Sequence, residues 1–220
     1  MFQNTFSYLN GYETFQLPIY PSNANKLEEN RKRIQITNIV SILKSNAIDE
    51  IAISLGQFEQ SYSEHYNCRQ TVTAGNFQNL DYCNKLLKLV TLNSNTFLIS
   101  VDKYLKIVKT FNRYEELKEV VDGLILDLDR QIPNISHTRN SALHVEQRLY
   151  QEAFKIPIDY QNEDNEGFLI SVLDGITLKY TSEKGKNVGL EISGNTLEII
   201  KQNFEKLKIA ILGKYPLDSI

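Results

Sequence analysis

The chain has 220 residues and a formal net charge of −3, and 41% of its residues are hydrophobic. This length suits one domain, or one domain with an appended piece, and the apolar content is enough to bury a core without metals or disulfides. The slightly acidic balance excludes a general attraction to nucleic acid, so any RNA binding must come from a local patch.

The cysteine content and the hydropathy indicate a reducing, aqueous compartment. Cys68 and Cys83 are the only cysteines, they form no CxxC motif, and the start of the chain has no secretory signal pattern. The longest apolar runs, such as residues 209–212, are too short to span a bilayer. We therefore expect a cytoplasmic protein with no membrane partner. The abundance of Asn, Ile, Lys and Tyr suggests an AT-rich bacterial genome.

Residues 1–25 are predicted to form an irregular N-terminal arm that is rich in aromatic side chains. Pro18 and Pro21 interrupt regular structure there. We expect the arm to pad the core of the protein, and a binding role is the less favoured alternative. Its aromatic residues are Phe2, Phe6, Tyr8, Tyr12, Phe15 and Tyr20.

Two helices are predicted next, over residues 26–45 and from residue 48 to residue 62. The first contains the basic cluster Arg31, Lys32 and Arg33, which we interpret as a solvated face rather than a phosphate-binding patch, because glutamates flank it. His65 is expected just past the end of the second helix, and residues 67–79 are expected to form a loop. His65 and the nearby Cys68 lack a third ligand at a useful spacing, so no metal site is predicted.

Three further helices are predicted over residues 81–90, 96–111 and 114–130, and another begins near Pro133. Asn112 is the expected cap of the helix over residues 114–130. Short connections imply antiparallel neighbours, so residues 26–156 are expected to form an antiparallel helical bundle. The predicted fold class is therefore mainly α. The seam of the helix over residues 114–130 consists of Leu117, Val121, Leu124 and Leu128.

Residues 157–220 are predicted to form a three-stranded antiparallel β-meander followed by a helix that packs on the bundle. Strands are expected at residues 168–173, 176–181 and 188–192, with Asp174 and Gly175 as the two-residue turn of the first hairpin and residues 184–186 as the second turn. The final helix is expected over residues 196–212, with Asn195 and Glu198 in a capping-box pattern. Its core-facing residues are Leu197, Ile200, Phe204, Leu207 and Ile211.

The most specific signal lies in residues 133–149, where a proline and turn-forming residues open a helical pattern. Two of the three histidines in the chain fall there. The predicted core-facing stripe consists of Ile135, Ala142, Val145, Leu149 and Ala153. The polar stripe opposite it consists of His137, Asn140, Ser141, His144 and Arg148, and Arg139 is long enough to reach that stripe. Histidine, arginine, amide and hydroxyl groups on one helix face suit phosphate chemistry.

Arg139, Asn140 and His144 resemble the Arg-x4-6-His motif of HEPN domains, which favours a polar residue directly after the arginine. HEPN domains are all-helical bundles common in bacterial toxin–antitoxin and phage-defence systems, and many are metal-independent endoribonucleases. The resemblance implies that Arg139 and His144 are catalytic, that Asn140 supports them, and that two copies dimerise with their motifs facing one another. It covers residues 26–154 at most, and no cofactor or metal is expected.

The polar stripe adds His137, Ser141 and Arg148 as supporting candidates. For His137, a position touching solvent at the start of the helix is favoured over a second acid–base role. A purely structural interpretation also exists, in which Arg139 pairs with Asp127 or Asp129 and His144 forms hydrogen bonds within the bundle.

Three functions remain open on the sequence alone. The first is a homodimeric endoribonuclease of the toxin–antitoxin or phage-defence type, with RNA as its substrate and an antitoxin or other protein as a further partner. The second is a non-catalytic HEPN-like module that binds nucleotides, RNA or a protein. The third is an interaction protein that works through its C-terminal tail and its aromatic arm.

Overall fold

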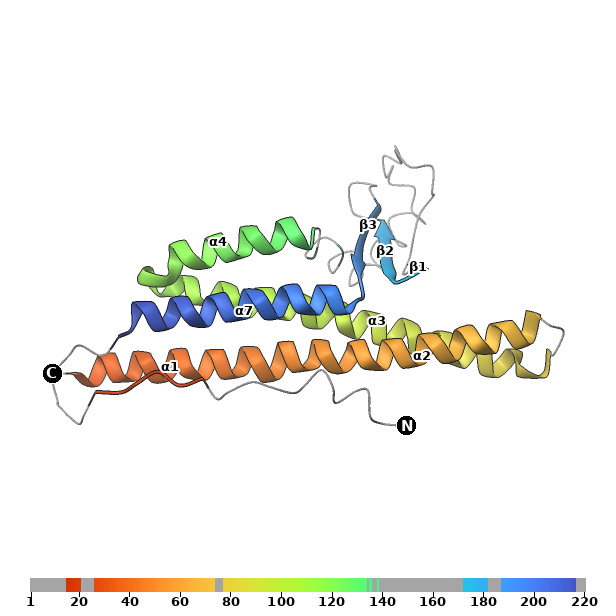
Figure 1. The fold of residues 1–220 in the computed structure, drawn as a ribbon, viewed down its shortest axis with the longest axis horizontal. Helices are drawn as coiled ribbons and strands as arrows, with labels where there is room; N and C mark the ends of the chain where they lie inside the picture. The colour runs from red at the N-terminus through yellow and green to blue at the C-terminus, as the bar shows by residue number, and fades with distance from the viewer. Residues whose placement is uncertain are drawn as a thin grey trace, which may run out of the picture.

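The computed structural model describes residues 15–20, 26–73, 77–133, 135, 138, 172–181 and 187–216. Within these residues the protein is mainly helical and carries a small three-stranded antiparallel sheet, as the sequence predicts. Figure 1 shows a long helical rod along one side of the molecule, with shorter helices and the sheet stacked on it. The α-helices are α1 (Leu27–Leu43), α2 (Asp49–Thr73), α3 (Leu80–Lys109), α4 (Glu115–Gln131) and α7 (Gly194–Lys214).

A single rod replaces the two separate helices predicted between residues 26 and 62. α1 continues through a π-helical turn, η3 (Lys44–Ile48), directly into α2 (Figure 1). The buried positions explain this. One series runs through Arg33, Ile36, Val40, Leu43 and Ala47, and a second series starts one residue later and runs through Ile48, Ile51, Leu55 and Phe58. A π turn holds one extra residue, so both series face the same core without a break in the helix.

α3 is also one helix where the sequence predicts two, because tertiary contacts use the polar residues of the expected gap. Asn93 Nδ2 donates to the carbonyl oxygen of Gln57 on α2 at 3.1 Å, and the Tyr180 hydroxyl of the sheet donates to Asn95. Residues 67–73, predicted as part of a loop, form the last turns of α2. A 3-10 turn, η4 (Phe77–Asn79), precedes α3, and α2 and α3 pack as an antiparallel hairpin.

α4 and α7 confirm the predicted apolar seams and close the core over the hairpin. α7 packs along α4 and also touches α2 and η3. The buried side-chain amide of Asn203 links α7 to α3 and to α4. The Tyr104 hydroxyl of α3 donates to Asn203 Oδ1 at 2.8 Å, and Asn203 Nδ2 donates to the Leu124 carbonyl oxygen of α4 at 2.9 Å. All predicted seam residues are buried, namely Leu117, Val121, Leu124, Leu128, Leu197, Ile200, Phe204, Leu207 and Ile211.

The two predicted helix caps are both wrong. α7 is capped by Ser193, whose Oγ accepts from the Thr196 backbone N–H at 3.2 Å, so the helix begins before the expected Asn195. α4 has Tyr114 at its N-cap without a side-chain bond, and Asn112 instead donates to Asp122 Oδ1 at 2.9 Å.

The sheet follows the predicted meander, with β1 (Val172–Asp174), β2 (Thr177–Thr181) and β3 (Asn187–Glu191) in the order β1-β2-β3. The predicted turn residues are wrong by one position, because Asp174 belongs to β1 and pairs with Thr177, so the two-residue turn is Gly175 and Ile176. Gly175 has φ +59°, the positive φ that the first position of such a turn favours. Leu178, Tyr180 and Leu190 are buried in the same core as the helices. The start of the first predicted strand, residues 168–171, and the second predicted turn, residues 184–186, lie outside the described residues.

Residues 15–20 of the N-terminal arm lie in an extended conformation along α1 (Figure 1). The Leu17 backbone N–H donates to Thr37 Oγ1 at 3.2 Å, and the Asn30 side chain both donates to and accepts from the backbone of Tyr20. Leu17 and Tyr20 are buried, so the prediction that the arm pads the core is confirmed for this part of it. Residues 1–14 and 21–25 are outside the described residues.

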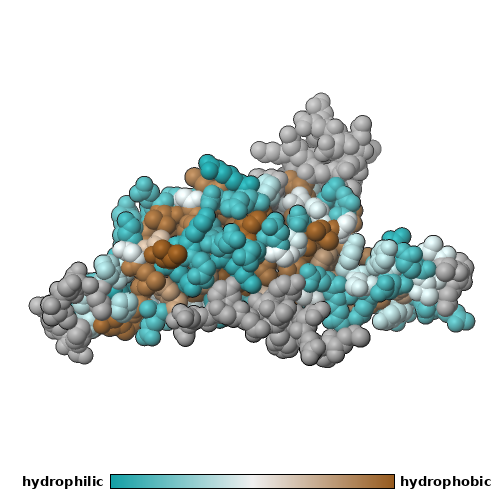
Figure 2. Space-filling model, viewed as in Figure 1, coloured by the Kyte–Doolittle hydropathy of each residue, from teal (hydrophilic) through white to brown (hydrophobic). Residues whose placement is uncertain are grey.

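The visible face of the molecule in Figure 2 is mixed, with apolar side chains in separate areas between polar ones. Exposed apolar residues include Leu89 and Leu92 on α3 and Ile209 on α7. Among the described helices, none combines the length and the hydropathy needed for a membrane span.

Candidate functional site

The six predicted site residues all lie outside the described residues, so their arrangement stays a prediction. The chain that leads into them is described. Ile132 is buried at the end of α4, and Ile135 and Thr138 are helical and fully buried. The core-facing position predicted for Ile135 is therefore confirmed, and the buried side continues to the residue directly before Arg139. The six residues are Arg139, His144, Asn140, His137, Ser141 and Arg148.

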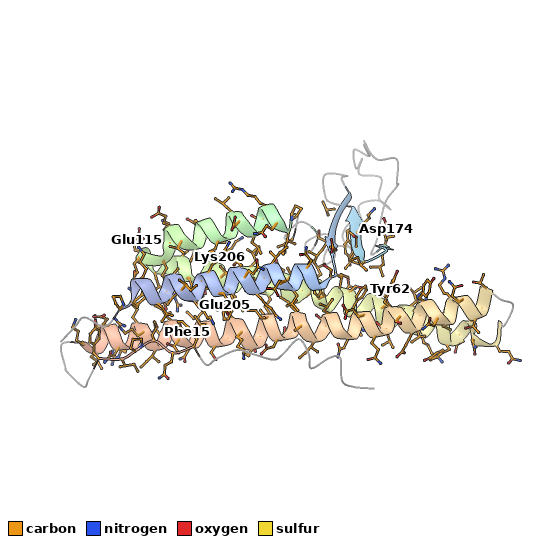
Figure 3. All side chains as sticks on the ribbon, viewed as in Figure 1. Phe15, Tyr62, Glu115, Asp174, Glu205 and Lys206 are labelled. Atoms are coloured by element: carbon orange, nitrogen blue, oxygen red, sulfur yellow. The ribbon has the colours of Figure 1, made fainter. Side chains whose placement is uncertain are left out.

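Asp127, one of the two carboxylates that a purely structural interpretation assigns to Arg139, already has a cationic partner. Lys206 on α7 lies 2.9 Å from Asp127 Oδ2, and this hydrogen bond and charge lower the pKa of the Asp127 carboxyl. Figure 3 labels Lys206 on α7, facing α4. Arg139 would have to share this carboxylate with Lys206, which weakens the structural interpretation for Asp127.

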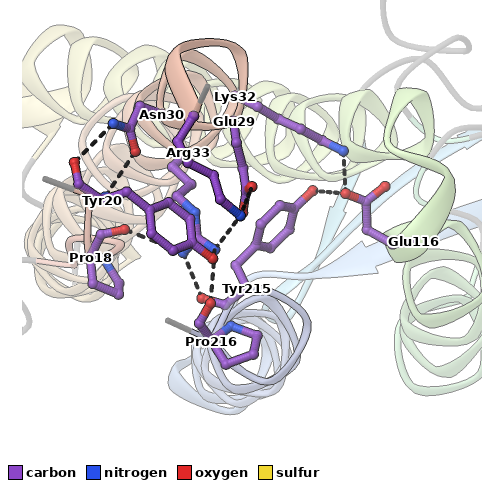
Figure 4. A network of polar contacts seen from close by, with 10 residues as sticks. Pro18, Tyr20, Glu29, Asn30, Lys32, Arg33, Glu116, Tyr215 and Pro216 are labelled. Atoms are coloured by element: carbon purple, nitrogen blue, oxygen red, sulfur yellow. Dashed lines mark hydrogen bonds and ion pairs between the residues drawn. The ribbon is translucent and has the colours of Figure 1, made fainter. Parts of the chain in front are cut away.

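A polar cluster around Arg33 joins the two described ends of the chain (Figure 4). The guanidinium is 2% exposed and donates to the carbonyl oxygens of Tyr215 and Pro216, each at 2.8 Å, and to Glu29 Oε1 at 2.9 Å. It also lies over the ring of Tyr20, 4.7 Å from its centroid. A cation at the end of α7 satisfies carbonyl groups that the helix leaves unpaired there.

A second set of polar contacts in the cluster is centred on Glu116 at the start of α4. The Lys32 ammonium and the Tyr215 hydroxyl both donate to this carboxylate. Burial acts to raise the pKa of Glu116, but these two hydrogen bonds, a backbone hydrogen bond and the charge of Lys32 together hold the pKa below its ordinary value. Burial and the contact with Glu116 raise the pKa of Tyr215.

The Arg33 cluster is a structural tie between the N-terminal arm, α1, α4 and the end of α7. It borders a cavity of about 350 Å³. The interpretation of Arg31, Lys32 and Arg33 as a solvated face is wrong for Arg33 and holds only for Arg31, which is exposed. The partners of Arg33 at Tyr215 and Pro216 are more than 180 residues away in sequence, so no local pattern could have revealed the tie.

A second hollow lies between the outer half of α2, α3 and the β1–β2 turn. We call it the His65 groove, and its volume is about 270 Å³. Figure 3 labels Tyr62, one of its lining residues, on α2. The prediction that His65 follows the end of a helix is wrong, because His65 lies inside α2. The lining residues are Tyr62, His65, Tyr66, Arg69, Leu87, Val90, Leu173 and Gly175.

The polar rim of the His65 groove comes from one stripe of α2. Tyr62, His65, Tyr66 and Arg69 are spaced i, i+3, i+4 and i+7, which places them on one helix face. Burial, and secondarily the charge of Arg69, lower the pKa of His65. The imidazole is therefore neutral at pH 7, with one donor and one acceptor nitrogen. This spacing was visible in the sequence and is the signal that could have found the groove.

The two cysteines lie together near the tip of the α2–α3 hairpin. Cys68 and Cys83 are both free thiols, and they share a small apolar cluster with Leu86 and Val72. Burial raises the pKa of the Cys68 thiol, and its hydrogen bond with Cys83 adds to the effect. Within the described part of the chain, no three His, Cys, Asp or Glu side chains are grouped closely enough to hold a metal ion.

Comparison with known proteins finds no matching family model, no matching curated protein and no matching solved structure.

Proposed function

We propose that the protein is a HEPN-like endoribonuclease that cleaves RNA without a metal, with Arg139 and His144 as its catalytic residues. The observation that supports this most strongly is the sequence motif Arg139-Asn140-x3-His144. The helical frame agrees with it, because Ile135 and Thr138 are helical and buried directly before the motif. At about 100° per residue, His144 falls on the side of such a helix opposite to Ile135, and therefore away from the core.

In the proposed reaction the 2′-hydroxyl of RNA attacks the adjacent phosphate. This needs a group that removes the proton from the 2′-hydroxyl, a group that protonates the leaving 5′-oxygen, and positive charge beside the phosphorane that forms at the phosphate. One imidazole can fill one of the two proton-transfer roles, as the base when it is neutral or as the acid when it is protonated, so one His144 supplies only one of them. The forked guanidinium of Arg139 can bind two phosphate oxygens and stabilise the charge that develops on them. Asn140, four residues before His144, can orient the imidazole or bind a phosphate oxygen.

A homodimer would place two copies of the motif at one site, so that one His144 acts as base and the other as acid. We propose this arrangement together with the ribonuclease function, and we propose that the protein works in the cytoplasm in a toxin–antitoxin or phage-defence role. The two free thiols at Cys68 and Cys83 fit a reducing compartment.

The test is cleavage of a fluorescently labelled cellular RNA pool in the presence of a chelator. We expect the natural sequence to cleave RNA, and His144→Ala and Arg139→Ala to lose at least about 100-fold in rate, the usual size of a general acid–base contribution. The matched control is Arg31→Ala, which removes an exposed arginine of α1 and should leave the rate unchanged. Equal cleavage by all four proteins would reject the proposal.

The non-catalytic alternative predicts RNA or nucleotide affinity without turnover, and a binding titration beside the cleavage assay separates the two. An interaction role for the C-terminal tail is favoured by one observation, namely that Val172 and Ile176 of the β1–β2 hairpin are 39% and 42% exposed. Charged substitutions at Val172 and Ile176 should then abolish partner capture without changing RNA cleavage.

A further inference from the structure

None of the residues that line the His65 groove takes part in the proposed chemistry at Arg139 and His144. Its lining combines three apolar side chains, Leu87, Val90 and Leu173, with two phenol rings, an imidazole and a guanidinium. Tyr62 stacks on Phe58 with ring centroids 5.5 Å apart, so that ring is fixed by the core. Tyr66 is 57% exposed, so its ring is available to a ligand.

The one formally charged side chain in the lining is the exposed guanidinium of Arg69. Among the described residues, no carboxylate forms an ion pair with Arg69. Asp174, next in sequence to two lining residues, pairs with Lys179 at 2.9 Å, and Glu64 accepts a hydrogen bond from Gln60. An exposed guanidinium beside a neutral imidazole can therefore bind an anionic group.

An exposed aromatic ring next to an arginine favours a nucleotide as the ligand of the His65 groove. An exposed aromatic face stacks on any nucleobase, and an arginine four or fewer residues away on the same helix face binds the adjoining phosphate. The volume is slightly below the usual range of about 300–1,000 Å³ for sites that enclose a small molecule. A site of this size suits one nucleotide of a strand that continues beyond the groove.

We propose that the His65 groove binds one nucleotide of single-stranded RNA, with the base on the ring of Tyr66, the phosphate on Arg69 and His65 hydrogen-bonded to the sugar or the base edge. This inference rests on the proposed ribonuclease function in one respect, because the bound strand is taken to be its substrate. The groove then holds the substrate away from the reacting phosphate and contributes to KM rather than to kcat.

The test measures binding of a fluorescein-labelled 12-nucleotide single-stranded RNA of mixed sequence by fluorescence anisotropy, with His144→Ala as the background protein. Tyr66→Ala should weaken binding by about tenfold, the effect expected for loss of one base-stacking contact, and Tyr66→Phe should restore it to within about twofold, since the ring is retained. Arg69→Ala should weaken binding and lower the slope of log Kd against log salt by about 0.7, the value for one phosphate contact to a single strand.

The matched control is Tyr82→Ala, because Tyr82 on α3 is 56% exposed and does not line the groove. It should bind the RNA like the background protein. Unchanged affinity in both Tyr66→Ala and Arg69→Ala would overturn the inference, as would no binding of the RNA at all. Displacement of the RNA by a polyglutamate peptide at equal charge concentration would also overturn it, because the site would then recognise acidic peptides.

Cleavage assays on the same groove variants in the active background separate this inference from the proposed function. If the protein cleaves RNA but Tyr66→Ala leaves KM unchanged, the groove assignment fails and the ribonuclease proposal stands. If the protein binds RNA through Tyr66 and Arg69 but His144→Ala makes no difference to cleavage, the groove assignment stands and the catalytic proposal fails.

Discussion

Replacing Arg33 by methionine is the substitution for which the structure predicts the clearest loss of stability. Methionine keeps an unbranched side chain in the buried position but removes the charge and all the donors. The carbonyl oxygens of Tyr215 and Pro216, which accept from Arg33 at 2.8 Å, lose this donor, and the one on Tyr215 loses it in a buried environment. The contacts that tie the N-terminal arm and the end of α7 to α1 are weakened at the same time.

The size of the effect follows from which partners are left without compensation. Removing one member of a buried ion pair costs about 3–5 kcal/mol. The side chain of Glu29 is 36% exposed, so water can solvate this carboxylate once Arg33 is gone. We therefore expect the lower end, a loss of about 3 kcal/mol in the free energy of unfolding. With a urea m-value of about 2–3 kcal/mol/M, the midpoint should fall by roughly 1–1.5 M.

The assay is urea unfolding followed by circular dichroism at 25 °C. Arg31→Met is the matched control, because Arg31 belongs to the same basic cluster but is exposed, and it should change the free energy by less than about 0.5 kcal/mol. Our account of the cluster would be refuted if Arg33→Met and Arg31→Met unfolded at the same urea concentration.

Three further predictions concern other contacts. Glu116 has a lowered pKa, so its carboxylate stabilises the fold above its ordinary pKa of 4.5 and loses that contribution as pH falls below it. Glu116→Gln should therefore make urea unfolding less dependent on pH between about pH 5 and 3. Tyr104→Phe removes the donor to Asn203 and should cost about 1–2 kcal/mol in the same urea assay. Oxidised glutathione should join Cys68 and Cys83 within one chain, seen as a mass loss of about 2 Da and a cross-linked peptide pair. The reaction should be slow, because burial raises the pKa of the Cys68 thiol and so lowers its thiolate fraction.

Each of these predictions has an opposite outcome that would count against it. An unchanged pH dependence in Glu116→Gln would mean that this carboxylate titrates alike in the folded and unfolded chain. Full stability of Tyr104→Phe would mean that the hydroxyl is not a buried donor, and Tyr82→Phe, an exposed tyrosine, is the control. Mixed disulfides with glutathione, without an internal bridge, would contradict the pairing of α2 with α3.

The apolar periodicity of the sequence was sufficient to predict α4, α7 and the sheet. Leu117, Val121, Leu124 and Leu128 recur at an undisturbed helical spacing, and all four are buried. The Asp174-Gly175 pair is likewise a local signal that located the hairpin, although the turn itself consists of Gly175, with its positive φ, and Ile176.

The mistaken helix boundaries have two physical causes. The π turn at residues 44–48 shifts the phase of the buried stripe by one residue, which in a sequence looks like the end of one helix and the start of another. In α3, Asn93 and Asn95 have low helix propensity, but their bonds to Gln57 and Tyr180 offset it. Contacts from distant parts of the chain decide both cases.

The candidate functional residues also differ in whether local spacing or distant contacts determine their surroundings. Arg33 was misinterpreted because its partners come from the opposite end of the chain, whereas the stripe of Tyr62, His65, Tyr66 and Arg69 depends on local spacing alone. The motif at Arg139 and His144 is also a local pattern, and its role stays a prediction until it is measured.

The most direct measurement of the proposed function is the rate of RNA cleavage by the natural protein and by His144→Ala. Both proteins are assayed at equal concentration in the presence of a chelator, and their circular dichroism spectra are compared to check that both are folded. We predict cleavage by the natural protein and a loss of at least about 100-fold in the variant. Absence of cleavage by the natural protein, or the same rate in both proteins, would contradict the assignment of His144 as the acid–base residue.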